Sequence, residues 1–258
     1  LASTSVPGML KQGYDPRLAT GVVAISGTLS MLIPPSVAMV LYAILAEVSV
    51  AKLLIAGIVP GILVTCTIMA TVLVLRWRNP SHAPAGQAYS MAEKLASLRG
   101  CWPFLVLFSG VTGVIYLGIG TPTEASGIGA LLACILAVAH GASFSQIKTA
   151  LIATIDASCM IALIMIGAHV FGYFLTMTQL TQNLFQWIVH ANIPDWGVLI
   201  TVLAIYLVLG CVMDLIAMLI LTVPIFAPMM ANLGYDPIWF AVITIVMAEV
   251  GLVTPPLG

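Results

Sequence analysis

The sequence predicts an all-α polytopic membrane protein built on an inverted repeat of broken helices. Three observations lead to this fold class: an apolar composition, apolar runs long enough to cross a bilayer, and a motif that occurs twice with a prolyl pair behind it. Of the 258 residues, 61% are hydrophobic and only 7% are charged, with a mean hydropathy of +1.15. Because a soluble domain carries about 25% charged residues, this chain cannot cover a water-facing surface.

The apolar runs divide the chain into successive membrane segments. Runs of roughly 20 residues, enough to cross a hydrocarbon core about 30 Å thick, recur along it. The predicted segments are an N-terminal arm (1–16), a broken transmembrane helix of the first repeat (17–46), a transmembrane helix (47–76), a cytoplasmic loop (77–103), transmembrane helices with an interfacial stretch (104–196), a re-entrant hairpin (197–233) and a broken transmembrane helix of the second repeat (234–258).

The basic residues orient this topology. We take residues 197–233 as a hairpin that enters and leaves the membrane on the same face. Lys52 is then the one basic residue on the side of the membrane opposite the start of the chain. The other seven of the eight lysines and arginines share the side of the start: Lys11, Arg17, Arg76, Arg78, Lys94, Arg99 and Lys148. By the positive-inside bias that side is cytoplasmic. A net charge of −1 suggests neither nucleic acid nor an anionic surface as a partner.

The two ends of the chain align without a gap. Residues 7–35 read PGMLKQGYDPRLATGVVAISGTLSMLIPP, and residues 228–256 read PMMANLGYDPIWFAVITIVMAEVGLVTPP. A constant shift (228 − 7 = 221) matches the tetrapeptide Gly-Tyr-Asp-Pro and both prolyl pairs. The topology has the two copies enter the membrane from opposite sides. Inverted repeats with interrupted helices are a signature of secondary transporters.

The prolyl pairs predict ion sites near the middle of the membrane. Each proline leaves the carbonyl one turn earlier without its hydrogen-bond donor, and hard cations prefer oxygen ligands. Packing kinks satisfied by neighbouring helices are the alternative. The residues predicted to support the breaks are Gly27, Thr28, Pro34, Glu249 and Pro255.

Five motifs, in this order, carry a family resemblance: GYDPRLATGVVAISGTLSMLIPPS, AGIVPGIL, GTPTEAS, GCVMDLIAMLILTVPIF and LGYDPIWFAVITIVMAEVGLVTPPLG. They resemble the large membrane subunit of tripartite ATP-independent periplasmic (TRAP) transporters. The resemblance implies sodium-driven uptake of an organic acid, such as a C4-dicarboxylate or a sialic acid. It also implies a small membrane subunit, a periplasmic substrate-binding protein, an elevator-type movement and a location in the inner membrane of a prokaryote.

The same resemblance implies specific site residues. Family members are longer at both ends, so residues 1–16 are expected to be the returning arm of a first re-entrant hairpin. The carbonyls of Ser30, Ile33 and Pro35 are expected to bind one sodium ion, although the family commonly has glycine where Ser30 stands. The shift of 221 assigns Gly251, Thr254 and Pro256 to a second ion. The hairpin and substrate-site candidates are Ser3, Ser5, Asp214 and Ala217.

Several other polar residues in the membrane segments have more than one possible role. Asp214 either caps the returning hairpin helix or borders the substrate site. Glu249 either satisfies exposed N–H groups or couples to ion or proton binding. Glu124 is interpreted as a first-turn helix charge. Asp156 and His169 are thirteen residues apart and form no pair, and a proton-relay role is the minor alternative for either.

Competing function classes fit less well. A channel would need a filter-like motif, and none is present. An intramembrane enzyme is disfavoured because H-E-x-x-H and G-x-S-x-G are absent, and the five scattered cysteines indicate packing rather than redox chemistry. Sodium is the only bound cofactor expected. The alternative within transporters is a stand-alone sodium/carboxylate symporter without a binding protein.

Overall fold

A computed structural model describes residues 2–79, 90–179, 182–183, 186–187, 190 and 193–255. All regular elements in these residues are helical, which confirms the all-α fold class. Four of the described helices are long and apolar enough to cross a membrane, and a fifth span results if a pair bent by 57° is counted as one. The chain is therefore a polytopic membrane protein.

The described part of the chain is a succession of helices. In chain order they are α1 (Ala2–Lys11), α2 (Pro16–Thr28), a single 3₁₀ turn (Leu29–Met31), α3 (Val37–Leu45), α4 (Val50–Ala56), α5 (Ile58–Arg78), α6 (Met91–Gly100), α7 (Trp102–Tyr116), α8 (Pro122–Ala139), α9 (Phe144–Met177), α11 (Asp195–Gly210), α12 (Leu215–Asn232) and α13 (Pro237–Leu252).

The ends of several helices lie close to the boundaries of the segments predicted from the sequence. The predicted broken helix 17–46 consists of α2, the 3₁₀ turn and α3, and the predicted hairpin 197–233 consists of α11 and α12. Some boundaries shift by about two residues: α5 continues to Arg78 rather than ending at 76, and α11 begins at Asp195. The predicted helix 47–76 contains two helices, since α4 ends at Ala56 and α5 begins at Ile58.

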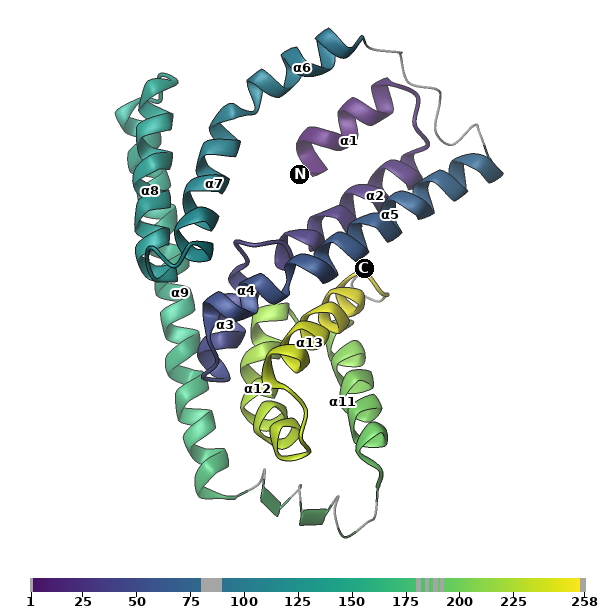
Figure 1. Cartoon of the computed structure of the whole chain (residues 1–258), viewed down its shortest axis with the longest axis vertical. Coiled ribbons are helices and arrows are strands. Elements are labelled where there is room, and N and C mark those ends of the chain that lie inside the picture. The colour runs from purple at the N-terminus through teal and green to yellow at the C-terminus, as the bar shows by residue number, and fades with distance from the viewer. Residues whose placement is uncertain are drawn as a thin grey trace.

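One hydrophobic core joins the two ends of the chain. It is formed mainly by α3, α4, α11, α12 and α13, with Tyr42, Met218 and Phe240 among its fully buried members. Figure 1 shows these helices gathered in the lower centre of the molecule, while α2 and α5 lie side by side above them. The helices α7 and α8 form a separate pair, and α9 packs against α12. Segments about 200 residues apart in sequence therefore share one core.

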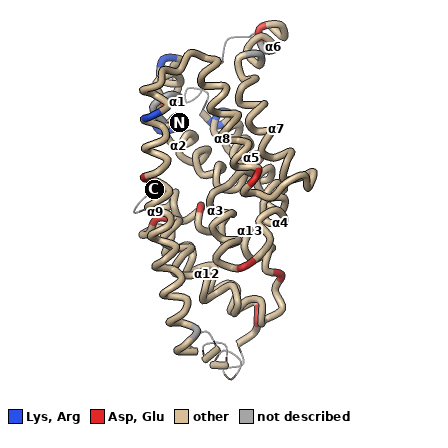
Figure 2. Tube along the Cα trace, turned by 90° about the vertical axis from the view of Figure 1, so that its left-hand side faces the viewer, with Lys and Arg blue, Asp and Glu red and all other residues tan. Residues whose placement is uncertain are grey.

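The outer surface carries the apolar side chains that a bilayer would cover. On α5 and α9, large side chains such as Leu63, Leu163 and Val170 are more than 60% exposed. A soluble monomer rarely exposes such continuous apolar surface. Figure 2 shows Lys and Arg confined to the upper part of the tube, near α1, α2 and α8, whereas most Asp and Glu lie lower.

Candidate ion and substrate site

Two Gly-Tyr-Asp-Pro turns have matching local geometry. Gly13 and Gly234 both adopt positive φ angles, of 84° and 86°, which glycine tolerates without steric cost. The N–H of Gly13 donates to the carbonyl of Leu10 at 3.0 Å, and that of Gly234 donates to Ala231, 221 residues later than Leu10, also at 3.0 Å. The repeated motif therefore folds twice into the same glycine-terminated helix end.

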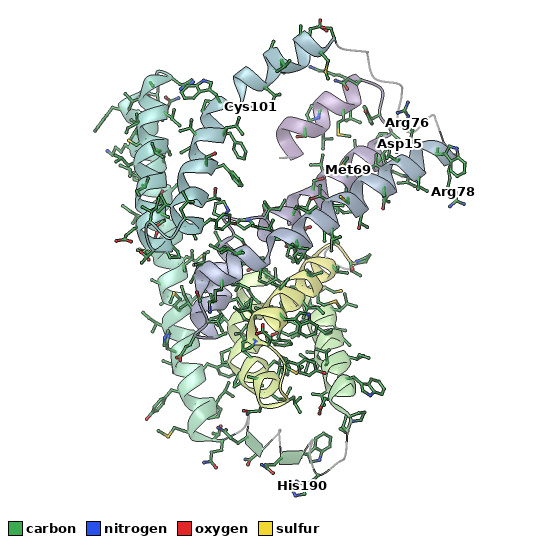
Figure 3. All side chains as sticks on the ribbon, viewed as in Figure 1. Asp15, Met69, Arg76, Arg78, Cys101 and His190 are labelled. Atoms are coloured by element: carbon green, nitrogen blue, oxygen red, sulfur yellow. The ribbon has the colours of Figure 1, made fainter. Side chains whose placement is uncertain are left out.

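The aspartate of each motif then caps the helix that follows. Asp15 Oδ1 accepts from the N–H of Arg17 at 2.8 Å and of Leu18 at 3.3 Å. Asp236 Oδ1 accepts from the two N–H groups at the same offsets, at 3.0 and 2.8 Å. The proline that follows occupies the first helical position, where its missing N–H costs nothing. In Figure 3, Asp15 lies at the same end of the α2–α5 pair as Arg76 and Arg78.

The first capped helix, α2, breaks at the first prolyl pair. Pro34 has no N–H to donate to the carbonyl four residues earlier, that of Ser30. Pro35 likewise leaves the carbonyl of Met31 unpaired within the helix, and the hydroxyl of Ser36 donates to it instead. The same hydroxyl oxygen accepts from the N–H of Met39 at 3.2 Å, which starts α3. The break is therefore a helix end and a new helix start held by one serine.

Two glycines let the first break lie close to the start of α5. A Cβ atom on Gly57 would come within 2.8 Å of the carbonyl oxygen of Leu32, and one on Gly61 within 3.0 Å of the Ile33 side chain. Small residues at this spacing let helices approach closely. Packing against α5 therefore supports the break in addition to the Ser36 hydrogen bonds.

The second capped helix, α13, breaks at the matching position. Pro255 has no N–H to donate to the carbonyl of Gly251, the position equivalent to Ser30. That carbonyl accepts from the N–H of Thr254 at 2.9 Å, which tightens the last turn. The Thr254 hydroxyl donates to the carbonyl of Val250 at 2.6 Å and keeps lone pairs for a further ligand. Pro256 lies outside the described residues.

The second break packs against the tip of the hairpin. A Cβ atom on Gly251 would come within 2.8 Å of Gly210 Cα and 2.9 Å of the Leu207 carbonyl oxygen, and a Cβ on Gly210 would come within 3.0 Å of the Ala248 carbonyl oxygen. Both glycines are buried. The backbones of α11 and α13 are therefore in direct contact where the predicted sodium ligand Gly251 lies.

Glu249 is buried beside this second break, at 4% exposure, where the first repeat has Thr28. Its Oε1 atom has no hydrogen-bond partner among the described residues. The prediction that this carboxylate satisfies exposed N–H groups is not met by that oxygen. Thr28, by contrast, donates its hydroxyl to the carbonyl of Ile25 at 2.9 Å. The second break thus carries a buried acidic group that the first lacks.

The remaining candidates lie apart from the breaks. Asp214 caps α12, with its carboxylate accepting from the N–H of Ile216 at 3.0 Å, and Ala217 lies in the first turn of the same helix. Ser5 lies on α1, half-buried, and the side chain of Ser3 is outside the described part. Glu124 forms a capping box with Thr121, whose N–H it accepts at 2.7 Å, as a first-turn charge.

A cavity of about 780 Å³ opens between the end of α3, α9 and α12, and its lining includes Glu47, His169 and Tyr173. Its lining includes no predicted sodium ligand. His169 is exposed and its Nδ1 lies 2.8 Å from the Met165 carbonyl oxygen, and Asp156 is exposed farther along α9. No group of three or more His, Cys, Asp or Glu residues that could hold a metal occurs in the described part of the chain.

Sequence reasoning missed two residues of these breaks. Ser36 lies directly after a prolyl pair and before an apolar run, which is a helix N-cap signal in sequence. Gly210 carried no such signal, because its importance comes from contact with a residue 41 positions away in the chain (251 − 210 = 41). Local signals could have found the first residue but not the second.

Comparison with known proteins identifies the family. The model of the family described as "Tripartite ATP-independent periplasmic transporter, DctM component" matches residues 1–258. The chain belongs to this family. It is 35% identical over its whole length to a C4-dicarboxylate TRAP transporter large permease protein from Pseudomonas aeruginosa, and 31% identical to one from Rhodobacter capsulatus. An ectoine/5-hydroxyectoine TRAP transporter large permease protein from Ruegeria pomeroyi is 32% identical over 98% of the chain.

The chain spans about 60% of the length of these relatives: 60%, 62% and 59% respectively. All three are named as permease subunits, so the TRAP family is a family of transport proteins and not of enzymes. The expected family resemblance is thereby confirmed.

Proposed function

We propose that this chain forms the core of a TRAP large permease subunit that imports an organic acid by coupling its movement to sodium. The observation that carries the proposal is that a proline removes the usual helical donor, the N–H four residues later, from the carbonyls of both Ser30 and Gly251. They follow two turns with the same caps and the same glycine conformation, at a constant shift of 221. A transporter needs such paired sites when two structural repeats alternate in exposing them.

The two copies are proposed to be inverted repeats. In Figure 1, α2 descends from its capped end, whereas α13 rises from its own toward the C-terminus. Equivalent helices that run in opposite directions are expected when one repeat enters from the cytoplasm and the other from the periplasm. The opposite direction supports inversion, and the matching turn geometry supports common origin.

The sodium ligands are proposed to be backbone oxygens of both breaks. One set is the carbonyls of Ser30, Ile33 and Pro35, and the second is Gly251, Thr254 and Pro256, with the Thr254 hydroxyl as a further oxygen. Carbonyl ligands suit a hard cation and avoid burying a full charge. At the second break, the carboxylate of Glu249 would add a favourable charge near the ion.

The substrate is proposed to be an organic acid held near the helix starts that the breaks create. No arginine lies within the breaks or the hairpin, so an anion would be bound by free N–H groups at helix N-termini. The names of the relatives mention C4-dicarboxylate, isethionate and ectoine. These names support the class of small organic solutes without selecting one.

The proposed assembly includes a small membrane subunit and a periplasmic substrate-binding protein in the inner membrane. The test is uptake of labelled organic acids into proteoliposomes that contain the intact subunit and its partners. Sodium would be compared with potassium at equal gradients, with and without the binding protein. Uptake that requires both supports the proposal, and sodium-dependent uptake without the binding protein supports a stand-alone symporter. Uptake that ignores sodium would overturn the assignment of the breaks as ion sites.

A further inference from the structure

Four cations lie at one end of the helices α1, α2 and α5. Lys11 ends α1, Arg17 lies in the first turn of α2, and Arg76 and Arg78 lie in the last turn of α5. All four residues are exposed. The helix α2 packs against both α1 and α5, and Figure 3 places Asp15, at the start of α2, at the same end as Arg76 and Arg78. We call these four cations the basic end.

The repeated turn does not itself require the cations that flank it. At the shift of 221, the second Gly-Tyr-Asp-Pro turn has Asn232 in place of Lys11 and Ile238 in place of Arg17. Both turns nevertheless have the same glycine conformation and the same aspartate cap. Arg17 also lies at the positive end of the α2 helix dipole, where a cation is locally unfavourable. An anion bound outside the helix would offset that cost.

The basic end has no counter-charge of its own. Asp15 is the carboxylate nearest to it in sequence, and its Oδ1 accepts from backbone N–H groups of α2. The side chains of the four cations form no ion pair or hydrogen bond with another described residue. Most Asp and Glu lie lower in the molecule (Figure 2), and charges are screened over about 8 Å at physiological ionic strength. The net charge of −1 therefore does not exclude an anionic partner at this end.

The basic end begins where the lipid-facing surface of α5 stops. Met69, Leu73 and Val74 are apolar side chains of α5 that are half exposed or more. Arg76 follows Val74 by two residues, or about 3 Å along the helix axis. Trp77 is 84% exposed, and tryptophan prefers the interface between membrane and water. Because the headgroup layer lies directly outside the hydrocarbon core, the basic end lies at the level of the lipid phosphates.

We propose that the basic end binds the headgroup phosphates of anionic phospholipids. Arginine presents a planar fork that matches phosphate oxygens, and two helices contribute three arginines here. Basic clusters directly beside a membrane span attract anionic lipid. A free phosphate ion has the same chemistry, but the apolar surface of α5 next to the site favours a lipid, whose acyl chains it can contact. A lipid bound to Arg17 and Arg76 would hold α2 and α5 together at the end opposite the first break.

The first test is lipid binding by the complete subunit, purified in detergent and titrated with phosphatidylglycerol or phosphatidylcholine in native mass spectrometry. The anionic phosphatidylglycerol should bind more tightly than the zwitterionic phosphatidylcholine. Arg17→Gln, Arg76→Gln and Arg78→Gln should each weaken binding of phosphatidylglycerol about fivefold and leave binding of phosphatidylcholine unchanged. Equal affinity of the wild type for the two lipids would overturn the proposal.

Matched variants separate this site from a general effect of positive charge. Lys148→Gln on α9 and Lys52→Gln on α4 each remove one exposed cation outside the basic end. Both should keep the affinity for phosphatidylglycerol within about twofold of wild type, because distant charges are screened. Arg76→Lys keeps the charge without the planar fork and should lose less affinity than Arg76→Gln. A loss from Lys148→Gln as large as that from Arg76→Gln would contradict the assignment to the basic end.

The second test distinguishes a lipid from a soluble anion. The thermal unfolding midpoint of the subunit in detergent would be measured with phosphatidylglycerol, and separately with potassium phosphate against potassium chloride at equal ionic strength. Phosphatidylglycerol should raise the midpoint of the wild type but not that of the variant with all three arginines replaced by glutamine. An equal rise with inorganic phosphate would assign the site to a soluble anion instead. Neither test involves transport, so uptake that ignores sodium would overturn the proposed function and leave the lipid site unaffected.

Discussion

The two breaks share a turn, a cap and a prolyl pair, but they are held in place differently. The first packs against the start of α5, where flexible side chains such as Met39 and Ile33 make much of the contact. The second packs backbone to backbone against the hairpin tip and has the buried Glu249 beside it. Equivalent local sequences have therefore acquired unequal surroundings, and we expect the second break to be the less tolerant of change.

The largest effect is expected where the second break meets the hairpin. Gly251→Ala places a methyl group within 3 Å of backbone atoms that cannot move aside, which should cost about 1–3 kcal/mol of folding stability. Thermal unfolding of the purified subunit and sodium-driven uptake would both show the loss. Gly21→Ala on α2 is the matched control, because a Cβ there meets nothing within 4 Å.

Gly210→Ala tests the same contact from the hairpin side and should reproduce most of the Gly251→Ala loss. The double variant should lose less than the sum of the two, since each single change already separates the helices. Full additivity would show that the two glycines do not act through one contact.

A smaller loss is expected at the first break. Gly57→Ala meets the Leu32 carbonyl oxygen at 2.8 Å but otherwise the flexible Met39 side chain, so we expect a cost of about 1 kcal/mol, at the low end of overpacking. The measurement is again the unfolding midpoint, beside Gly21→Ala. A loss as large as that of Gly251→Ala would remove the difference between the two breaks.

The two breaks should also differ in how a side-chain substitution changes the affinity for sodium. Thr254→Val removes a hydroxyl that we propose as an ion ligand, and losing one such contact should raise the half-saturating sodium concentration about tenfold, equal to roughly 1.4 kcal/mol. Ser30→Ala should stay near wild type, because Ser30 is expected to bind through its carbonyl while its hydroxyl donates to Gly27. Equal effects of both variants would contradict carbonyl coordination at Ser30.

The smallest effects should come from the aspartate helix caps, which both repeats share. Asp15→Ala and Asp236→Ala each remove a cap with two N–H partners, at a cost of roughly 0.5–1 kcal/mol each. Asp→Asn at either position should retain most of the stability, because asparagine also caps. Clearly unequal losses from the two alanine variants would show that tertiary surroundings outweigh the local cap even here.

Sequence reasoning succeeded where the physics is local. The repeated tetrapeptide and the helix breaks depend on residues within four positions of one another, so their patterns could be recognised from the chain alone. Both interpretations of Glu249 remain open, because the partners of a buried carboxylate depend on which helices surround it. The ligand roles of Ser30, Ile33 and Thr254 remain predictions, since their carbonyls are identified without a bound ion.

The sequence by itself determined the membrane class, the repeated turn and the positions of both helix breaks. An apolar composition makes the chain more stable in lipid than in water. Proline removes a backbone hydrogen-bond donor wherever it occurs, so it interrupts a helix in any tertiary context. Only the tertiary structure decided that Gly210 contacts Gly251 and that Gly57 and Gly61 receive the first break. Those contacts join residues about 25 to 41 positions apart in the chain, and no local rule selects which distant backbone approaches which.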